Sequence, residues 1–213
     1  MPGTGQLYQK IHDLFEQPFV FNAYQSVVDG GKGRQIQKFL RGLPYSSVVD
    51  IGCGTGNWSQ VSDAAYLGID TSASFIAGCK KRYADDPTKR FIQADAASLD
   101  TTERFDLGML ISVLHHLSDD QVERLLYWLQ HTVRYFFVLD LYPIHRNPLS
   151  KWLYQMDRGS FIRQPHVQVE LLTSRDRFRL VKQGDYFAPT GLYRHTLLLL
   201  ESARYESNSI DAP

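Results

Sequence analysis

Residues 48–56 read Val48-Val49-Asp50-Ile51-Gly52-Cys53-Gly54-Thr55-Gly56, a short apolar run that leads into a turn with three glycines. Glycine adopts backbone dihedrals that are closed to other residues, and it lets a ligand approach the backbone without meeting a Cβ. Residues 57–64 are predicted to form a helix after this turn, and its first N–H groups would point back at such a ligand. The stretch therefore predicts a strand, a tight turn and a helix around a binding site for a nucleotide-like molecule.

The glycine spacing differs from that of the common dinucleotide-binding turn. Dinucleotide enzymes also carry a glycine-rich turn after their first strand, but usually with the spacing G-x-G-x-x-G. Here the third glycine comes one residue early, and Asn57 stands in its usual place. A nicotinamide oxidoreductase is therefore the weakest of the functions that such a turn allows.

Polar residues end the apolar runs that follow the turn. The runs at 66–69, 90–94 and 105–111 lead into Asp70, Asp95 and the segment Ser112-Val113-Leu114-His115-His116. Asp70 comes twenty residues after Asp50, a spacing that suits a carboxylate accepting hydrogen bonds from both hydroxyls of a ribose. Because the carboxyl ends of parallel strands share one edge of a sheet, we expect these side chains to line one ligand site.

With these residues in order, the chain resembles the class I S-adenosylmethionine-dependent methyltransferases over about residues 48–201. The shared features are the glycine turn, the ribose acid Asp70, the adenine-contacting Asp95 with Ala96, and the segment 113–117 after the fourth strand. The resemblance implies S-adenosyl-L-methionine as cofactor and S-adenosyl-L-homocysteine as product. The residues that it implies as cofactor-binding are Asp50, Gly52, Cys53, Gly54, Gly56, Asp70, Thr71, Asp95, Ala96, Ser112 and Val113.

The composition fits one soluble globular domain. Of the 213 residues, 43% are hydrophobic and 22% are charged, which is ordinary for an α/β domain with a substantial core. Lys plus Arg equals Asp plus Glu at 23 each, so the formal net charge is zero. No global basic field attracts phosphate backbones, and nucleic acid is therefore a disfavoured partner.

The cysteines and the apolar stretches bear on the cellular compartment. Only Cys53 and Cys79 occur, without zinc-ligand spacing, and Cys53 is interpreted as a small spacer in the turn rather than a nucleophile. The N-terminus lacks a signal-like region, and no apolar stretch approaches the roughly twenty residues of a membrane span. We expect a cytoplasmic protein without membrane insertion, either a monomer or a homodimer.

The middle of the chain alternates strands with helices. Strands are predicted at 47–52, 65–70, 89–94, 105–111 and 134–141, and helices at 57–64, 72–83 and 118–131. Ser72 suits a helix N-cap, and Ser118-Asp119-Asp120-Gln121 has the capping-box pattern. This alternation predicts a parallel sheet with helical crossovers.

The final third predicts a helix at 166–173 and strands at 179–187 and 194–201. The link through Ala188-Pro189-Thr190-Gly191 is too short for a parallel crossover and predicts a hairpin. The resemblance implies an α/β fold with a doubly wound, mostly parallel seven-stranded sheet and an antiparallel terminal strand. Helices would cover both faces, and an N-terminal helical lid would complete the fold.

The chain is interpreted as a single domain with two parts. Residues 1–45 form an N-terminal helical segment, and residues 46–213 form the methyltransferase domain with a substrate-side insert at about 143–165. Two roles stay open for the N-terminal segment: a plain helical layer on the sheet, or a lid over the cofactor. As a lid, its aromatic residues, Tyr24 among them, would exclude water and contact cofactor or acceptor.

Methyl transfer from a sulfonium is an in-line displacement, for which the protein mainly aligns the partners and excludes water. A base is needed only if the nucleophile keeps a proton, and His116 or His115 is the candidate to take it. His116 is preferred slightly, on the resemblance alone. The alternative for either histidine is a hydrogen-bonded wall residue. Magnesium prefers oxygen ligands, and only Asp140 lies near Ser112 and the histidines, so no metal is predicted.

The acceptor is expected to contact residues after the fifth strand and in the insert. The candidate substrate residues are Tyr24, Tyr142, Trp152, Arg158 and Arg163. Aromatic faces with guanidinium groups suit an acceptor with a flat or aliphatic body and an anionic group. The alternative is structural, with Trp152 covering the sheet and Arg158 in an ion pair.

The leading hypothesis is methyl transfer to an oxygen or nitrogen of a small metabolite, a lipid-like molecule or a natural-product intermediate. After the fourth strand, enzymes that methylate amino groups of nucleobases or glutamine typically show an Asp/Asn-Pro-Pro-aromatic turn, which the chain lacks at 112–115. Two alternatives stay open. One is an RNA or protein methyltransferase, and the other is a noncatalytic or cyclase-type protein that binds the cofactor without methyl transfer.

Overall fold

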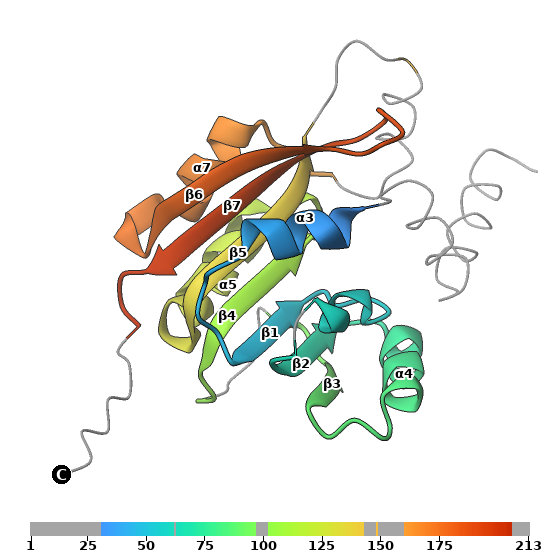
Figure 1. The fold of residues 1–213 in the computed structure, drawn as a ribbon. Helices are drawn as coiled ribbons and strands as arrows, with labels where there is room; N and C mark the ends of the chain where they lie inside the picture. Colours follow the sequence, from blue (N-terminus) through green and yellow to red (C-terminus); the bar gives the residue numbers. More distant parts are fainter. Residues whose placement is uncertain (1–30, 62, 97–101, 143–147, 149–159, 206–213) are drawn as a thin grey trace, which may run out of the picture.

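One sheet organises the part of the chain that the computed structural model describes, residues 31–61, 63–96, 102–142, 148 and 160–205. Its strand order is β3-β2-β1-β4-β5-β7-β6 (Figure 1). The strands are β1 (Ser47–Ile51), β2 (Ala65–Asp70), β3 (Lys89–Gln93), β4 (Phe105–Ile111), β5 (Val133–Tyr142), β6 (Phe178–Phe187) and β7 (Arg194–Ser202). The first five pair in parallel, and β7 runs antiparallel to both β5 and β6. The predicted doubly wound sheet with an antiparallel last strand is confirmed.

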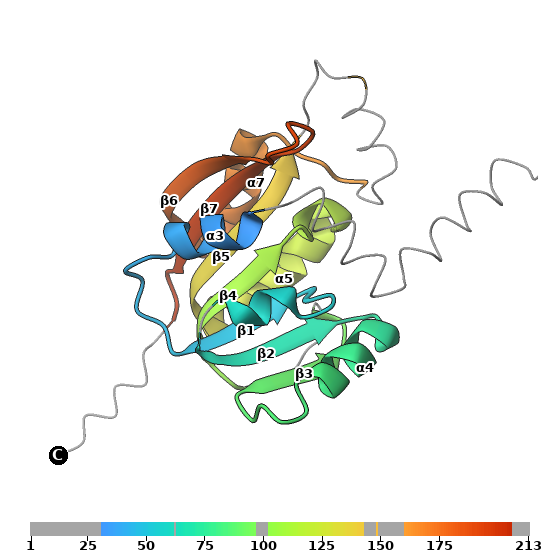
Figure 2. The ribbon, with the colours of Figure 1, turned by 45° about the vertical axis from the view of Figure 1, so that its right-hand side comes forward.

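Helices cover both faces of this sheet. The helical elements described are α3 (Lys32–Phe39), η1 (Asn57–Gln60), α4 (Ala73–Arg82), η3 (Leu114–His116), α5 (Asp119–Thr132), α7 (Pro165–Leu172) and η4 (Ser174–Asp176). Apolar residues of α3 and α4 share one buried cluster, whereas those of α5 and α7 share the cluster on the opposite face. Figures 1 and 2 show α3 on one side of the sheet and α5 with α7 on the other.

The central strands are apolar on both faces because both faces are covered. On β4, Leu110 belongs to the cluster with α5, while Met109 and Ile111 belong to the cluster with α3. All three side chains are at most 4% exposed. Strands buried on both sides form the rigid part of such folds, so the carboxyl ends of β1, β2, β4 and β5 are held at fixed positions along one edge.

The helix predicted at 57–64 is wrong in length and type. Only Asn57–Gln60 is helical, and it is a short 3₁₀ helix, with the Ser59 N–H donating to the Gly56 carbonyl at 3.2 Å. Gly56 precedes it in a left-handed conformation and provides no side-chain cap. Because β2 begins at Ala65, the connection from β1 is too short for several α-helical turns and the return to the sheet.

The other elements lie within one or two residues of their predicted bounds, because local chemistry sets their ends. The Ser72 hydroxyl accepts from the Phe75 N–H, and Ser118 forms the capping box with Gln121 in both directions. The hairpin between β6 and β7 closes with the Gly191 N–H donating to the Ala188 carbonyl at 2.8 Å.

Part of the predicted N-terminal segment lies outside the described residues. Residues 1–30, which include Tyr24, are not described, whereas α3 packs on the sheet through Ile36 and Leu40. Among the helices that the structure describes, none combines the length and the apolar character needed to cross a bilayer.

The capping box of α5 yields a stability prediction. Ser118→Ala removes the acceptor for the Gln121 N–H and should lower the free energy of unfolding by about 1 kcal/mol, measured by urea denaturation. Ser118→Asp keeps a capping oxygen and should retain most of the stability. Equal stability of the Ala and Asp variants would contradict the role of the cap.

Candidate active site

The glycine turn, residues 52–56, requires glycine at all three positions because of its backbone conformation. Gly52, Gly54 and Gly56 have φ angles of 70°, 54° and 73°, which lie in the left-handed region that side chains disfavour. A Cβ on Gly52 would also stand 2.5 Å from Val113 Cγ2. The backbone N–H of Gly52 donates to the Ile69 carbonyl at 2.8 Å, which fixes the turn beside the end of β2.

Asp70 joins the glycine turn to the next crossover. Its Oδ2 accepts from the Gly54 N–H at 2.8 Å, and its Oδ1 accepts from the Ser72 N–H at 2.8 Å. A carboxylate offers about four lone-pair directions, so each oxygen keeps the capacity for a further donor. The Asp70 side chain is half-buried at the carboxyl edge of the sheet, where it was predicted to be.

Thr71, Asp95 and Ala96 lie beside Asp70. The Ala94 N–H donates to the Asp70 carbonyl at 3.0 Å, and Gln93 Nε2 donates to the Thr71 carbonyl at 3.2 Å. The Asp95 side chain is exposed, whereas Ala96 is 9% exposed. The ends of β2 and β3 therefore bring together the residues that were predicted to hold the adenosine part of a ligand.

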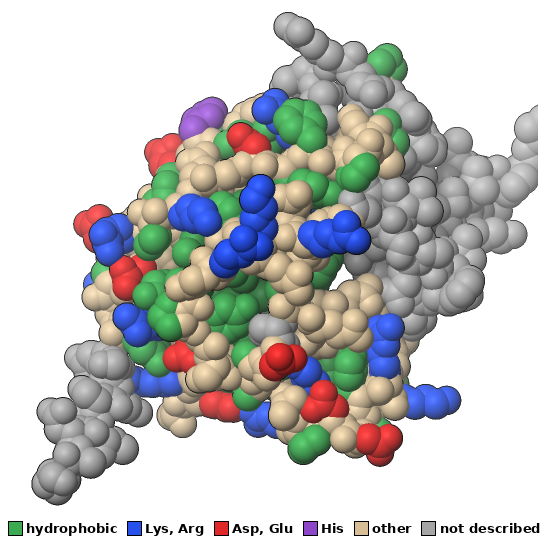
Figure 3. Space-filling view, viewed as in Figure 1, with side chains coloured by type: hydrophobic (Ala, Val, Ile, Leu, Met, Phe, Trp, Pro, Cys, Tyr) green, Lys and Arg blue, Asp and Glu red, His purple; other side chains and the backbone are tan. Residues whose placement is uncertain are grey.

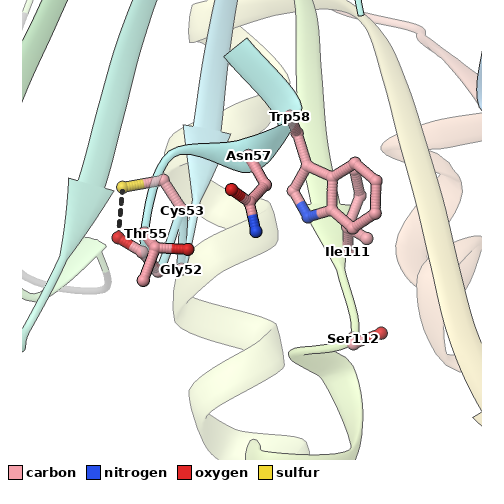
Figure 4. A pocket seen from close by; sticks show the side chains of 8 residues that line it. Gly52, Cys53, Thr55, Asn57, Trp58, Ile111 and Ser112 are labelled. Atoms are coloured by element: carbon pink, nitrogen blue, oxygen red, sulfur yellow. Dashed lines mark hydrogen bonds between the residues drawn. The ribbon is translucent and has the colours of Figure 1, made fainter. Parts of the chain in front are cut away.

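A small, solvent-open hollow lies between the glycine turn and the end of β4 (Figure 4). Figure 4 shows Trp58 extending from η1 toward the end of β4, where Ile111 and Ser112 lie. The residues that line the hollow are Gly52, Cys53, Gly54, Thr55, Asn57, Trp58, Ile111 and Ser112. Thr55, Asn57 and Trp58 were not predicted as site residues.

Cys53 lines the hollow but is a packing residue. Its side chain is 3% exposed, and its Sγ lies 3.8 Å from the Gly54 carbonyl oxygen. A Cβ on Gly68 of β2 would stand 2.9 Å from this sulfur. The small thiol therefore fills the space under the turn, in agreement with its interpretation as a spacer.

Asp50 does not reach the hollow, so its predicted contact with the cofactor is not supported. Its side chain is fully buried on β1 and accepts a hydrogen bond from the Tyr66 hydroxyl. Burial raises the pKa of Asp50 to about 7, Tyr66 opposes this shift, and the nearby Asp70 adds to it. The alternation of side chains along β1 turns Asp50 into the core, where it bonds to Tyr66 of β2.

His115 and Asp140 form a buried dyad at the ends of β4 and β5. His115 Nδ1 lies 2.6 Å from Asp140 Oδ1, and the side chains are 3% and 1% exposed. Asp140 Oδ2 accepts from the His115 N–H at 3.1 Å, and Oδ1 accepts from the Leu141 N–H at 2.6 Å. His116, by contrast, is exposed, with its ring centroid 4.1 Å from that of His115.

Two further buried residues complete this region, and sequence reasoning missed both. Lys32 of α3 is 1% exposed, and its Nζ donates to Ser112 Oγ at 2.9 Å. His195 of β7 is 1% exposed, and its pKa lies well below the ordinary value because of burial and the nearby charges of Lys32 and His115. We call Lys32, Ser112, His115, Asp140 and His195 the polar cluster.

Of the predicted substrate residues, Tyr142 and Arg163 are described, and Tyr24, Trp152 and Arg158 lie outside the described residues. The Tyr142 hydroxyl donates to Asp185 Oδ1 at 3.1 Å, and burial with this carboxylate raises the pKa of Tyr142 to about 12.

The Arg163 guanidinium holds the segment between β4 and α5. It donates to the carbonyls of Leu114 and Leu117 at 3.0 and 2.7 Å, and to Asp119 Oδ1 at 2.7 Å. These contacts occupy the donors that were predicted to meet the acceptor. Arg163 is therefore described best as a structural residue, which corrects the substrate role expected from sequence.

Comparison with known proteins agrees with this geometry. Residues 48–134 match the model of a family described as a methyltransferase domain. The tRNA (carboxymethyluridine(34)-5-O)-methyltransferase of Schizosaccharomyces pombe is 32% identical over 87 residues, 40% of this chain and 36% of that protein. The trans-aconitate 2-methyltransferase of Methylobacterium nodulans is 40% identical over 80 residues, 33% of this chain and 30% of that protein. The chain thus matches about a third of the length of these curated relatives.

Solved structures with low identity share the fold over most of the chain. Magnesium protoporphyrin IX methyltransferase from Synechocystis PCC 6803 aligns with a TM-score of 0.67 at 16% identity, covering 92% of this chain and 99% of that one. The N-methyltransferase NodS from Bradyrhizobium japonicum aligns with a TM-score of 0.65 at 14% identity, covering 81% and 86%. The strand order and the glycine turn agree with the methyltransferase-domain match over residues 48–134, and the chain shares the fold of these S-adenosylmethionine-dependent methyltransferase structures.

The buried carboxyl of Asp50 yields a prediction on pH. Its pKa is raised on folding, so its contribution to stability is fully present below pH 4 and is lost as the pH rises to about 7. Asp50→Asn keeps a partner for Tyr66 and removes this titration. Between pH 4 and pH 8, the free energy of unfolding of the wild type should therefore fall by on the order of 3–4 kcal/mol relative to that of the variant.

The measurement is the free energy of unfolding of both proteins by urea denaturation across this pH range. Other titrating groups, such as His195, are shared by both proteins and cancel in the difference. A difference that does not vary with pH would mean that Asp50 is not neutralised by burial.

Proposed function

We propose that this chain binds S-adenosyl-L-methionine and transfers its methyl group to an oxygen or nitrogen of a small metabolite, lipid-like molecule or natural-product acceptor. The single observation that carries the proposal is the hydrogen bond from the Gly54 N–H to Asp70 Oδ2, at the rim of a hollow lined by the left-handed glycine turn. This arrangement places a backbone free of side chains next to a carboxylate with remaining acceptor capacity, as a ribose-containing cofactor requires.

The residues present fit the proposed cofactor. A Cβ on Gly52 would collide with Val113, and one on Gly56 would stand 3.0 Å from Phe91. The turn can therefore pack this closely against its neighbours only with glycine at these positions. Asp70 would hold the ribose hydroxyls, Asp95 and Ala96 would flank the adenine, and Ser112 with Val113 would lie toward the methyl-donating end. When bound, the cofactor supplies a methyl group already activated by the positive charge on sulfur.

In this proposal, the dyad of His115 and Asp140 removes the proton from the acceptor. The proposal assigns the proton of neutral His115 to Nδ1, which donates to the Asp140 carboxylate, and gives Nε2 the role of taking a proton from an attacking O–H or N–H. The carboxylate also stabilises the imidazolium that forms. We prefer His115 over His116 as the base because a buried partner orients it, whereas the family resemblance had favoured His116 slightly.

A second candidate, methylation of RNA, has the identity with the tRNA methyltransferase in its favour. Zero net charge argues against it, because nucleic-acid binding depends on a basic surface. On the face seen in Figure 3, basic side chains gather in the middle, around α3, and basic and acidic side chains are mixed elsewhere. Radiolabelled transfer into separated small-molecule, RNA and protein fractions of a cell extract would distinguish the two functions, and label in RNA alone would overturn the first.

Asp70 provides the test of cofactor binding. Asp70→Ala removes the acceptor for the Gly54 N–H and for the ribose hydroxyls. The affinity for S-adenosylhomocysteine, measured by isothermal titration calorimetry, should fall about 10- to 100-fold. Asp63→Ala, at an exposed position before β2, should leave the affinity unchanged. NAD should give no heat. Wild-type protein that binds no S-adenosylhomocysteine would refute the proposal.

The two histidines provide a matched test of the base. His115→Gln should lower kcat by about 10²- to 10⁴-fold with an acceptor that must lose a proton, while the affinity for S-adenosylhomocysteine persists. His116→Gln should retain nearly full turnover, because its side chain is exposed and lies outside the dyad. The reverse pattern would assign the base to His116, and full turnover in both variants would remove a histidine base from the mechanism.

A further inference from the structure

Lys32 is a buried cation in contact with Ser112, one of the residues that line the hollow. The side chains of Ile36 and Leu40, 0% and 3% exposed, anchor α3 on the sheet, and Lys32 stands at the start of this helix. A Cβ on Gly33 would lie 3.9 Å from Trp58 Cζ3, so α3 touches the residue that forms one side of the hollow. The Lys32 side chain is therefore held between the core and the proposed methyl-transfer site.

The contact with Ser112 directs the Lys32 ammonium toward the hollow. Lys32 Nζ donates to Ser112 Oγ at 2.9 Å, and Ser112 is a lining residue. Ser112 has a φ of 57°, a left-handed conformation that costs a non-glycine residue about 1 kcal/mol or more and that concentrates at functional sites. Because the hydroxyl accepts from the ammonium, its own hydrogen points elsewhere and can donate to a ligand.

Two other members of the polar cluster, His195 and Asp140, shape the electrostatics around Lys32. His195 is neutral, since its pKa is depressed by burial and by the charge of Lys32. The Asp140 carboxylate is occupied by donors of His115 and Leu141. An anionic group that reached Ser112 would meet the Lys32 ammonium in a low-dielectric setting, where opposite charges attract most strongly.

We propose that Lys32 and Ser112 bind a carboxylate of the methyl acceptor and so select acidic small molecules as substrates. The inference rests on the proposed methyl transfer. One ammonium and one hydroxyl offer two donors for the two oxygens of a carboxylate, whereas a phosphate with its higher charge calls for more donors. The bound carboxylate would lie next to His115, so the acceptor would be anchored at one end and deprotonated near the other.

The first arm of the test identifies the charge class of the acceptor. A small-molecule extract is separated by anion exchange at neutral pH, and each fraction is incubated with wild-type protein and radiolabelled S-adenosylmethionine. Label should arise from the retained fraction, survive phosphatase treatment of that fraction, and be lost after its carboxylates are esterified in acidic methanol. Label from the unretained fraction, or loss of label after phosphatase, would overturn the carboxylate site while leaving methyl transfer intact.

The second arm tests the lysine. Lys32→Met keeps the side-chain volume without the charge and should raise the KM for the active fraction at least about 10-fold, with kcat and the Kd of S-adenosylhomocysteine within about twofold of wild type. Lys32→Arg should recover part of the loss. Lys38→Met, at an exposed position of the same helix, is the matched control and should behave as wild type.

Each outcome of the second arm decides the role of Lys32. An unchanged KM in Lys32→Met overturns the proposal, and so does a parallel loss of S-adenosylhomocysteine affinity, which would give Lys32 a role in the cofactor site. Lys32→Gln serves in its place if the Met variant does not fold. Wild-type protein that binds no S-adenosylhomocysteine and labels no fraction would refute the proposed function itself, a result distinct from either of these.

Discussion

The hydrogen bond between the Gly54 N–H and Asp70 Oδ2 is the interaction on which the rest of the site depends. It joins the turn after β1 to the end of β2, and the Gly52 N–H adds a second link to the Ile69 carbonyl. Both bonds require the left-handed backbone of the glycine turn, because only that path turns successive N–H groups toward β2. The hollow exists where it does because these bonds hold its floor in place.

The end of β4 connects the two halves of the site. Val113 packs against the place where a Cβ of Gly52 would stand, so the glycine turn and the β4 loop are fitted to each other. Ser112, one residue earlier, lines the hollow and accepts from Lys32. The two halves of the site therefore meet at two consecutive residues, Ser112 and Val113. One half, at β1 to β3, would hold adenosine, and the other is the polar cluster at β4, β5 and β7.

Buried charge in this protein is compensated locally rather than by distant ion pairs. Burial keeps Asp50 neutral below about pH 7, and its carboxyl bonds to Tyr66. Asp140 is surrounded by the donors of His115 and Leu141, and His195 is kept neutral beside Lys32. Buried titratable groups in such number at one edge of a sheet are typical of a working site, since burial and neighbouring charges shift their proton affinities.

The order of the strands along the chain, the glycine turn, the acid at Asp70 and the caps of α4 and α5 could be predicted from sequence. Each depends on residues a few positions apart, through strand alternation, left-handed glycines or a hydroxyl three residues before an N–H. The same local reasoning failed where a short connection overrode helix propensity, as at η1, and where strand alternation turned Asp50 away from the ligand side.

Only the tertiary structure decided the polar cluster. Its contacts join residues 25 positions apart in the case of His115 and Asp140, and 80 positions apart in the case of Lys32 and Ser112. The sequence by itself determined that a nucleotide-like cofactor would bind at the carboxyl edge of a parallel sheet, because the ends of such strands must converge. It did not determine which lysine, histidine and acid would meet there, because proximity and burial arise only when distant segments pack together.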